Sequence, residues 1–167
     1  LNQTPARQAP TLLVAVARPD LWRRARQLNL DHYAAEGGPA WALEKYRRTV
    51  PLIYDDGPLH LLAPLKACAQ AIQGLFAPTW RGPFGYWGAQ LWATKTTALA
   101  CENLMLGLRA AGYDSCPMEG FDESRLKRLL NLPREARVVM VLAAGRRVEG
   151  GVVAQVRFDR ALFIRQA

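Results

Sequence analysis

The stretch Ala100-Cys-Glu-Asn-Leu-Met-Leu-Gly-Leu-Arg-Ala-Ala-Gly-Tyr-Asp-Ser-Cys-Pro-Met-Glu-Gly-Phe-Asp122 decides the fold. Its first half belongs to a longer segment, Gly88–Gly112, in which Ala, Leu, Met and Glu dominate, so this segment predicts a long helix that stops at Gly112. Apolar residues occupy nearly every face of this helix. That pattern is typical of a central helix covered by neighbouring elements or by a second subunit.

The residues after this helix predict a loop, a helix and a buried strand. Asp114–Phe121 contains Pro and Gly and predicts the loop. Asp122 is a good N-cap for a helix that reaches about Leu130. The near-continuous apolar run Arg137–Ala144 predicts a strand buried on both faces, and Val152–Phe158 is expected to be extended.

The N-terminal part predicts one strand and two helices. Thr11–Ala17 is a short apolar run between Pro10 and Arg18, which favours a buried strand. Asp20 is the expected N-cap of the following helix, and Trp41–Arg48 predicts a second, short helix.

Residues 50–87 differ in character from the rest and predict an insertion that packs on the body of the protein. Leu59–Phe76 is apolar and helical, and residues 77–87 form a loop rich in aromatic residues, Pro and Gly. We expect a lid over an active site, in which Trp80, Phe84 and Tyr86 stack on an aromatic ligand. The alternative is that this segment is an extra piece of core.

Composition excludes several classes. The 167 residues are expected to form a single domain over residues 1–167, with a net charge of +8 that admits anionic partners. No apolar run is long enough to predict a membrane span. Three cysteines without metal-ligand spacing predict a reducing cytoplasm and no metal site. Because the chain starts at Leu1, we expect a processed start or a part of a longer protein.

Two features near the buried strand, a turn with backbone donors and a pair of arginines, are typical of a site for an anionic ligand that has a planar ring. Pro117 and Gly120 flank a turn that contains Glu119 and can present backbone N–H groups. Arg146 and Arg147 follow the strand, and a planar guanidinium binds phosphate oxygens bidentately. The alternative is an ordinary turn followed by solvated arginines.

The quoted stretch, together with Leu130–Pro133 and Val138–Leu142, closely resembles the C-terminal half of the FMN-dependent nitroreductase family. The resemblance covers about Ala93–Phe158. It implies an α+β fold in which a mixed sheet is flanked by helices and two subunits join through their long central helices as a homodimer. The family's N-terminal FMN-binding segment has no counterpart before Leu1, so we expect an N-terminally truncated version of this fold.

The resemblance also implies a chemistry. Family members use FMN to take hydride from NAD(P)H and pass electrons to a nitroaromatic, a quinone or a similar small acceptor by a ping-pong mechanism. Transferred onto this sequence, the backbone at Glu119 and Gly120 lies against the flavin N5, and Pro117 and Met118 line the ring. No catalytic side chain is implied. The residues expected to hold the flavin phosphate are Arg146, Arg147 and Arg157.

Two other functions are compatible with the sequence. One is a different flavin-linked role on the same fold, or impaired FMN binding, because a fold does not determine a function. The other is nucleic-acid binding, suggested by the net charge and the arginines within Arg18–Arg26, but no recognition motif accompanies them. We therefore expect no specific nucleic-acid partner.

Overall fold

The sheet at the centre of the protein has three described strands. The computed structural model describes residues 3–148, 150–151, 154 and 156–165. Strands β1 (Thr11–Ala17), β3 (Arg137–Gly145) and β2 (Asp114–Met118) are neighbours in that order, and both pairs are antiparallel. The expected α+β class is confirmed. The sheet is antiparallel rather than mixed over the described strands, because the central strand β3 runs opposite to both of its neighbours.

Strand β2 was expected to be a loop, and this prediction is wrong for residues 114–118. Pro117 argued against a strand here, since proline has no N–H to donate to a neighbouring strand. The strand tolerates this residue because it lies at the edge of the three-stranded order, where Pro117 stands opposite Leu142.

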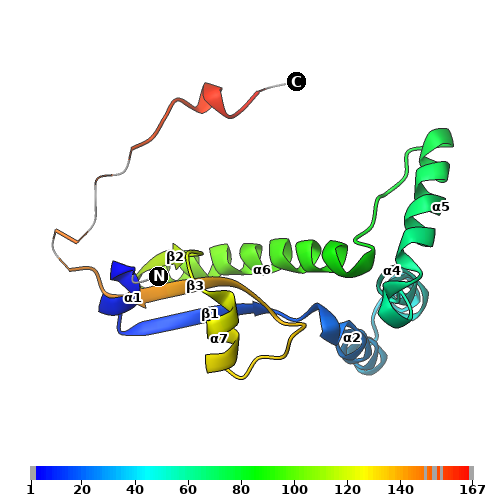
Figure 1. The fold of residues 1–167 in the computed structure, drawn as a ribbon, viewed down its shortest axis with the longest axis horizontal. Helices are drawn as coiled ribbons and strands as arrows, with labels where there is room; N and C mark the ends of the chain where they lie inside the picture. Colours follow the sequence, from blue (N-terminus) through cyan, green and yellow to red (C-terminus); the bar gives the residue numbers. More distant parts are fainter. Residues whose placement is uncertain (1–2, 149, 152–153, 155, 166–167) are drawn as a thin grey trace.

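Helices cover both faces of the sheet (Figure 1). On one face, Met118, Val141 and Ala143 form a buried cluster that packs against residues of α1 (Thr4–Gln8) and α7 (Glu123–Leu129). Successive strand residues alternate in direction, so Leu142 and Ala144 face the other side, along which α6 (Gly85–Ala110) runs. Leu142 is fully buried, and the prediction that this strand is buried on both faces is confirmed.

Helix α6 begins three residues earlier than expected and ends at Ala110, close to the left-handed Gly112. Its first residues therefore come from the predicted 77–87 loop. The helix is covered on one side only: Ala93 and Cys101 are buried, whereas Leu91 and Leu99 are more than 60% exposed. Burial also raises the pKa of the Cys101 thiol.

The two predicted N-caps behave differently. Asp122 is confirmed, since its carboxylate accepts a hydrogen bond from the Arg125 N–H at 3.0 Å, which lowers the pKa of Asp122. Asp20 does not cap a helix. It lies in the 3-10 turn η1 (Pro19–Leu21), and its carboxylate pairs with Arg18 at 2.7 Å because this strong local cation competes with the helix N-terminus.

Helix α2 (Trp22–Glu36) follows η1 and ends at the left-handed Gly37. The predicted short helix at Trp41–Arg48 is divided into α3 (Ala40–Glu44) and the π-helical turn η2 (Lys45–Thr49). The helical path then continues into α4, Val50–Tyr54.

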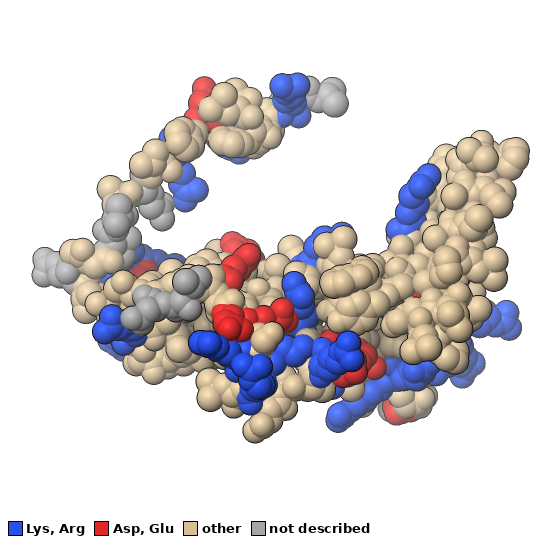
Figure 2. All heavy atoms as spheres, in the orientation of Figure 1, with Lys and Arg blue, Asp and Glu red and all other residues tan. Residues whose placement is uncertain are grey.

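Residues 57–84, here called the arm, leave the body of the protein. The arm contains the 3-10 turn η3 (Pro58–His60) and α5 (Ala63–Phe76), and α5 stands away from the sheet (Figure 1). No residue of α5 is buried, and its apolar side chains give the arm a largely uncharged surface (Figure 2). The expected packing against the body is not observed in the single chain, because only the base of the arm contacts other elements.

The C-terminal segment that carries η4 (Arg160–Leu162) also runs away from the sheet (Figure 1). Of the extended conformation expected for Val152–Phe158, residues 152, 153 and 155 lie outside the described residues. Within the described part of the chain, no helix has both the length and the apolar character needed to cross a membrane.

Candidate functional site

The four residues expected beside a flavin ring lie together at one end of β2. Pro117 and Met118 are its last residues, and Glu119 and Gly120 form the turn that follows. The Met118 side chain is packed in the sheet core, whereas Pro117 and Glu119 are exposed. A ligand at this end can therefore contact the side chain of Pro117 but only the backbone of Met118.

The backbone of this turn offers an unused donor. The Glu119 carbonyl accepts from the Phe121 N–H at 2.9 Å, and the Gly120 carbonyl accepts from the Gln3 side-chain amide at 3.4 Å. The N–H of Gly120 donates no hydrogen bond within the described residues. Gly120 is only half-buried, so this N–H can serve a ligand.

A cluster of guanidinium groups lies at the other end of β2, around Asp114. The Asp114 carboxylate accepts from Arg109 and from Arg147, each at 3.0 Å. The Arg146 guanidinium lies 5.7 Å from the ring centre of Tyr113. Two guanidinium groups therefore share one carboxylate, and a third lies beside the adjacent Tyr113, which leaves an excess of positive charge for an anion.

The structure brings together two of the three predicted phosphate ligands. Arg146 and Arg147 belong to the cluster around Asp114, and Arg109 is a third member that the sequence analysis missed. Arg157 is exposed and belongs to the C-terminal segment that leaves the sheet (Figure 1).

The two ends of β2 are separated by a distance that suits an elongated ligand. Asp114 and Met118 are four residues apart in an extended strand, which is about 13 Å at 3.3 Å per residue. A ligand with a planar ring at the Gly120 end and an anionic group at the Asp114 end matches this arrangement.

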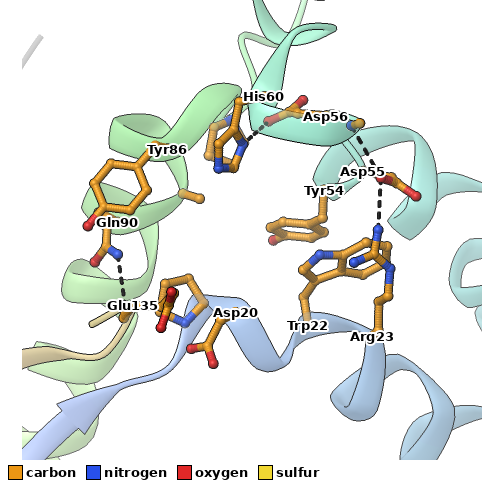
Figure 3. A pocket seen from close by; sticks show the side chains of 14 residues that line it. Asp20, Trp22, Arg23, Tyr54, Asp55, Asp56, His60, Tyr86, Gln90 and Glu135 are labelled. Atoms are coloured by element: carbon orange, nitrogen blue, oxygen red, sulfur yellow. Dashed lines mark hydrogen bonds and ion pairs between the residues drawn. The ribbon is translucent and has the colours of Figure 1, made fainter. Parts of the chain in front are cut away.

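A separate cavity of about 280 Å³ lies at the base of the arm (Figure 3). Trp22 and Tyr54 lie side by side on one wall, with ring centres 6.1 Å apart, and His60 and Glu135 border the same space. Burial raises the pKa of the Tyr54 hydroxyl.

The three aspartates that line this cavity accept hydrogen bonds from nearby cations. A hydrogen bond from Arg23 lowers the pKa of Asp55, and one from Arg18 lowers the pKa of Asp20. Asp56 is buried and paired with Lys66 at 3.0 Å. The first two pairs stabilise the ionised forms of Asp55 and Asp20.

Two buried polar residues here had no distinguishing signal in the sequence. Gln90 is 6% exposed, and its side-chain N–H donates to the Glu135 carbonyl at 3.1 Å. The Gln90 side-chain oxygen has no partner among the described residues. Asp56 belongs to an Asp-Asp-Gly-Pro string, which predicts only a turn. The sequence does not indicate that Asp56 is buried, because its burial depends on distant residues that pack on it.

The three predicted lid residues do not gather at one place. Tyr86 lies in the first turn of α6 and borders the cavity at the base of the arm. Trp80 is exposed and borders a larger apolar groove, of about 590 Å³, beside Trp92. Phe84 is half-buried, with its ring 5.6 Å from the Lys66 ammonium. Among the described residues, no group of three or more His, Cys, Asp or Glu side chains could hold a metal ion.

These elements define an α+β protein with a long helix against an antiparallel sheet and a candidate site for an anionic ligand along its edge strand. A sequence model of the Nitroreductase family matches residues 86–146. Protein DrgA of Synechocystis sp. is 42% identical over 57 residues, which are 34% of this chain and 27% of that protein. NADH dehydrogenase of Thermus thermophilus is 35% identical over 86 residues, which are 52% of this chain and 40% of that protein.

Solved structures show the same fold. A protein from Exiguobacterium sibiricum assigned as a nitroreductase, in complex with FMN, has a TM-score of 0.67 and 18% sequence identity. The comparison covers all of this chain and 67% of the other. Residues 86–146 therefore match the nitroreductase family, and the chain shares the fold of solved nitroreductase structures. The matched segments span less than half of the length of these two curated relatives.

Proposed function

We propose that this chain is part of an FMN-dependent oxidoreductase that takes hydride from NAD(P)H and reduces a nitroaromatic, a quinone or a similar small acceptor. The observation that carries this proposal is that a Gly120 N–H with no acceptor among the described residues lies at one end of β2, while the arginine cluster lies at the other end. The complex of FMN with a structural relative and the name of the Thermus relative support it.

In this proposal the chain binds and orients the cofactor. FMN, when bound, supplies the hydride chemistry. The Gly120 N–H places a donor where the ring gains electron density on reduction, which favours the reduced state. Arg146, Arg147 and Arg109 would hold the phosphate of bound FMN, which would compete with Asp114 for the hydrogen bonds that Arg109 and Arg147 donate.

The surface of α6 supports a homodimer. Leu91, Leu99 and Leu106 are each at least 60% exposed on a helix that the sheet covers from one side only. An apolar helical face of this kind is expected to be buried by another element or another subunit. We place this enzyme in the cytoplasm, where thiols such as the exposed Cys68 remain reduced.

The test is a two-step anaerobic reaction with FMN-loaded protein. NADH or NADPH is expected to bleach the flavin absorption, and a nitroaromatic or quinone added after removal of the nucleotide is expected to restore it. This sequence of events defines a ping-pong exchange. Protein that binds FMN but is bleached by neither nucleotide would contradict the proposed activity.

A further inference from the structure

Both ends of the arm are formed by glycines in the left-handed conformation. Gly57 has a φ of +71° and Gly85 has a φ of +72°. A Cβ atom on Gly57 would lie 3.3 Å from the Leu62 side chain, and one on Gly85 would lie 3.3 Å from the Cβ of Ala63. Glycine adopts this conformation without the steric cost that other residues have, so each end of the arm can act as a hinge.

The buried carboxylate of Asp56 lies between these two glycines. It accepts a hydrogen bond from the Gly85 N–H at 2.7 Å and one from the Lys66 ammonium at 3.0 Å. His60 lies 3.5 Å from the same carboxylate (Figure 3). One side chain therefore joins η3, the first turns of α5 and the start of α6.

The backbone around Asp56 reinforces this junction. The Asp56 carbonyl accepts from the Leu62 N–H at 2.9 Å, and the Asp55 carbonyl accepts from the Lys66 ammonium at 2.8 Å. Beyond its base the arm is little constrained, because α5 has no buried residue and Leu75 and Phe76 are at least 80% exposed.

The cavity at the base of the arm provides room for motion. Its lining includes Asp56, Gly57 and Tyr86, and on the opposite side Trp22 and Glu135. The arm can therefore tilt toward the body without first displacing packed side chains. Any tilt that separates Gly85 or Lys66 from the Asp56 carboxylate leaves a buried charge with fewer partners, which is unfavourable.

We infer that Asp56 is a positioning residue that sets the angle of the arm between the Gly57 and Gly85 hinges. In the cofactor-loaded enzyme it would thereby control access of the acceptor. The second part rests on the proposed function and on the expectation from the sequence that this segment is a lid over the active site, whereas the first part rests on neither.

A distance measurement tests the hinge without cofactor or acceptor. One spin label is placed on the exposed Cys68 of α5 and one on α7 through Ser124→Cys, with Cys116→Ser to prevent a third label. We expect a single narrow distance distribution for this background and a clearly broadened one after Asp56→Ala. The matched control is Asp55→Asn, which changes the neighbouring carboxylate that pairs with Arg23 of α2 and is expected to leave the distribution narrow.

A second variant covers the case in which Asp56→Ala does not fold, as judged by circular dichroism. Lys66→Met removes the α5 partner of the carboxylate and keeps the bond from Gly85. It is also expected to broaden the distribution. An unchanged narrow distribution in a folded Asp56→Ala or Lys66→Met protein would overturn the inference.

Steady-state kinetics separate positioning from simple support of the fold. If the fraction of molecules with the arm correctly placed falls to between a third and a tenth, the acceptor KM rises by about three- to tenfold, with little change in kcat. We expect this for Asp56→Asn, with unchanged FMN affinity, and no change for Asp55→Asn. Loss of kcat and FMN binding together with an unbroadened distribution would mean that Asp56 does not position the arm.

Discussion

Asp114 decides how strongly the candidate site attracts an anion, because it neutralises part of the charge of two arginines. It pairs with Arg109 and Arg147 while remaining partly exposed, so a phosphate can compete for both. Hydrogen bonds to charged groups contribute about 1.5–3 kcal/mol each. The balance between these pairs and a bound phosphate gives two predictions of opposite sign.

Arg147→Ala is expected to weaken FMN binding by about ten- to a hundredfold, since it removes a charge-assisted contact with the phosphate. Fluorescence titration of FMN measures this change. The control is Arg128→Ala, which removes an equally exposed arginine from α7. Equal FMN affinities for the two variants would mean that Arg147 does not contact the phosphate.

Asp114→Asn is expected to have the opposite effect and to tighten FMN binding by up to about tenfold, because it removes the repulsion between a carboxylate and the phosphate. Comparison of FMN with riboflavin, which lacks the phosphate, isolates this effect. Riboflavin affinity should not change. If Asp114→Asn weakens FMN binding, then the carboxylate positions the arginines instead of competing for them.

The helix caps could be predicted from the sequence in part, and the buried polar residues could not. Asp122 caps a helix as expected, because one of its oxygens accepts from the Arg125 N–H while the other lies 3.3 Å from the Arg125 guanidinium. Asp20 does not cap a helix, because Arg18 donates to both of its carboxylate oxygens. The buried positions of Asp56 and Gln90 depend on residues 29 and 45 positions away, so no local pattern could indicate them.

Among the elements, those with a strong apolar pattern were predicted and those without it were missed. β1, β3 and the long helix follow from their apolar runs. β2 was missed because Pro117 breaks its pattern. The arm was expected to pack on the body because of its apolar residues, but such residues equally form a surface that another subunit covers.

The position of β3 at the centre of the sheet gives a stability prediction. Leu142 is fully buried between the sheet and α6, so Leu142→Ala is expected to lower the free energy of unfolding by about 2–5 kcal/mol. Urea titration monitored by circular dichroism measures it. Leu75→Ala, on the exposed arm, is the matched control and should change this free energy by less than about 0.5 kcal/mol. A similar loss in both variants would contradict the layered arrangement of sheet and α6.

The exposed face of α6 gives a prediction about assembly. Leu99 is 69% exposed in the single chain, and Leu99→Glu would place a charge in the proposed subunit interface. We expect the dimer to dissociate to monomer or to aggregate, as measured by sedimentation velocity. Leu129→Glu makes the same change at a 76% exposed leucine on α7, across the sheet, and should leave the dimer intact. A stable dimer in both variants would mean that the subunit interface does not include this face of α6.

Two projections, the arm and the C-terminal segment, extend from the body of the protein (Figure 1). The largely uncharged arm contrasts with the basic surface below the sheet (Figure 2). With a net charge of +8, the protein attracts anions generally, so an anion-binding result is informative only if it distinguishes one anionic ligand from a similar neutral one.

Equilibrium dialysis of the purified chain against FMN and against riboflavin provides that distinction and tests the central claim most directly. The account predicts that one FMN binds per chain, at least about tenfold more tightly than riboflavin, because only FMN reaches the arginine cluster with its phosphate. Failure to retain FMN, or equal affinity for the two flavins, would contradict a flavin site that extends from Gly120 to Arg147.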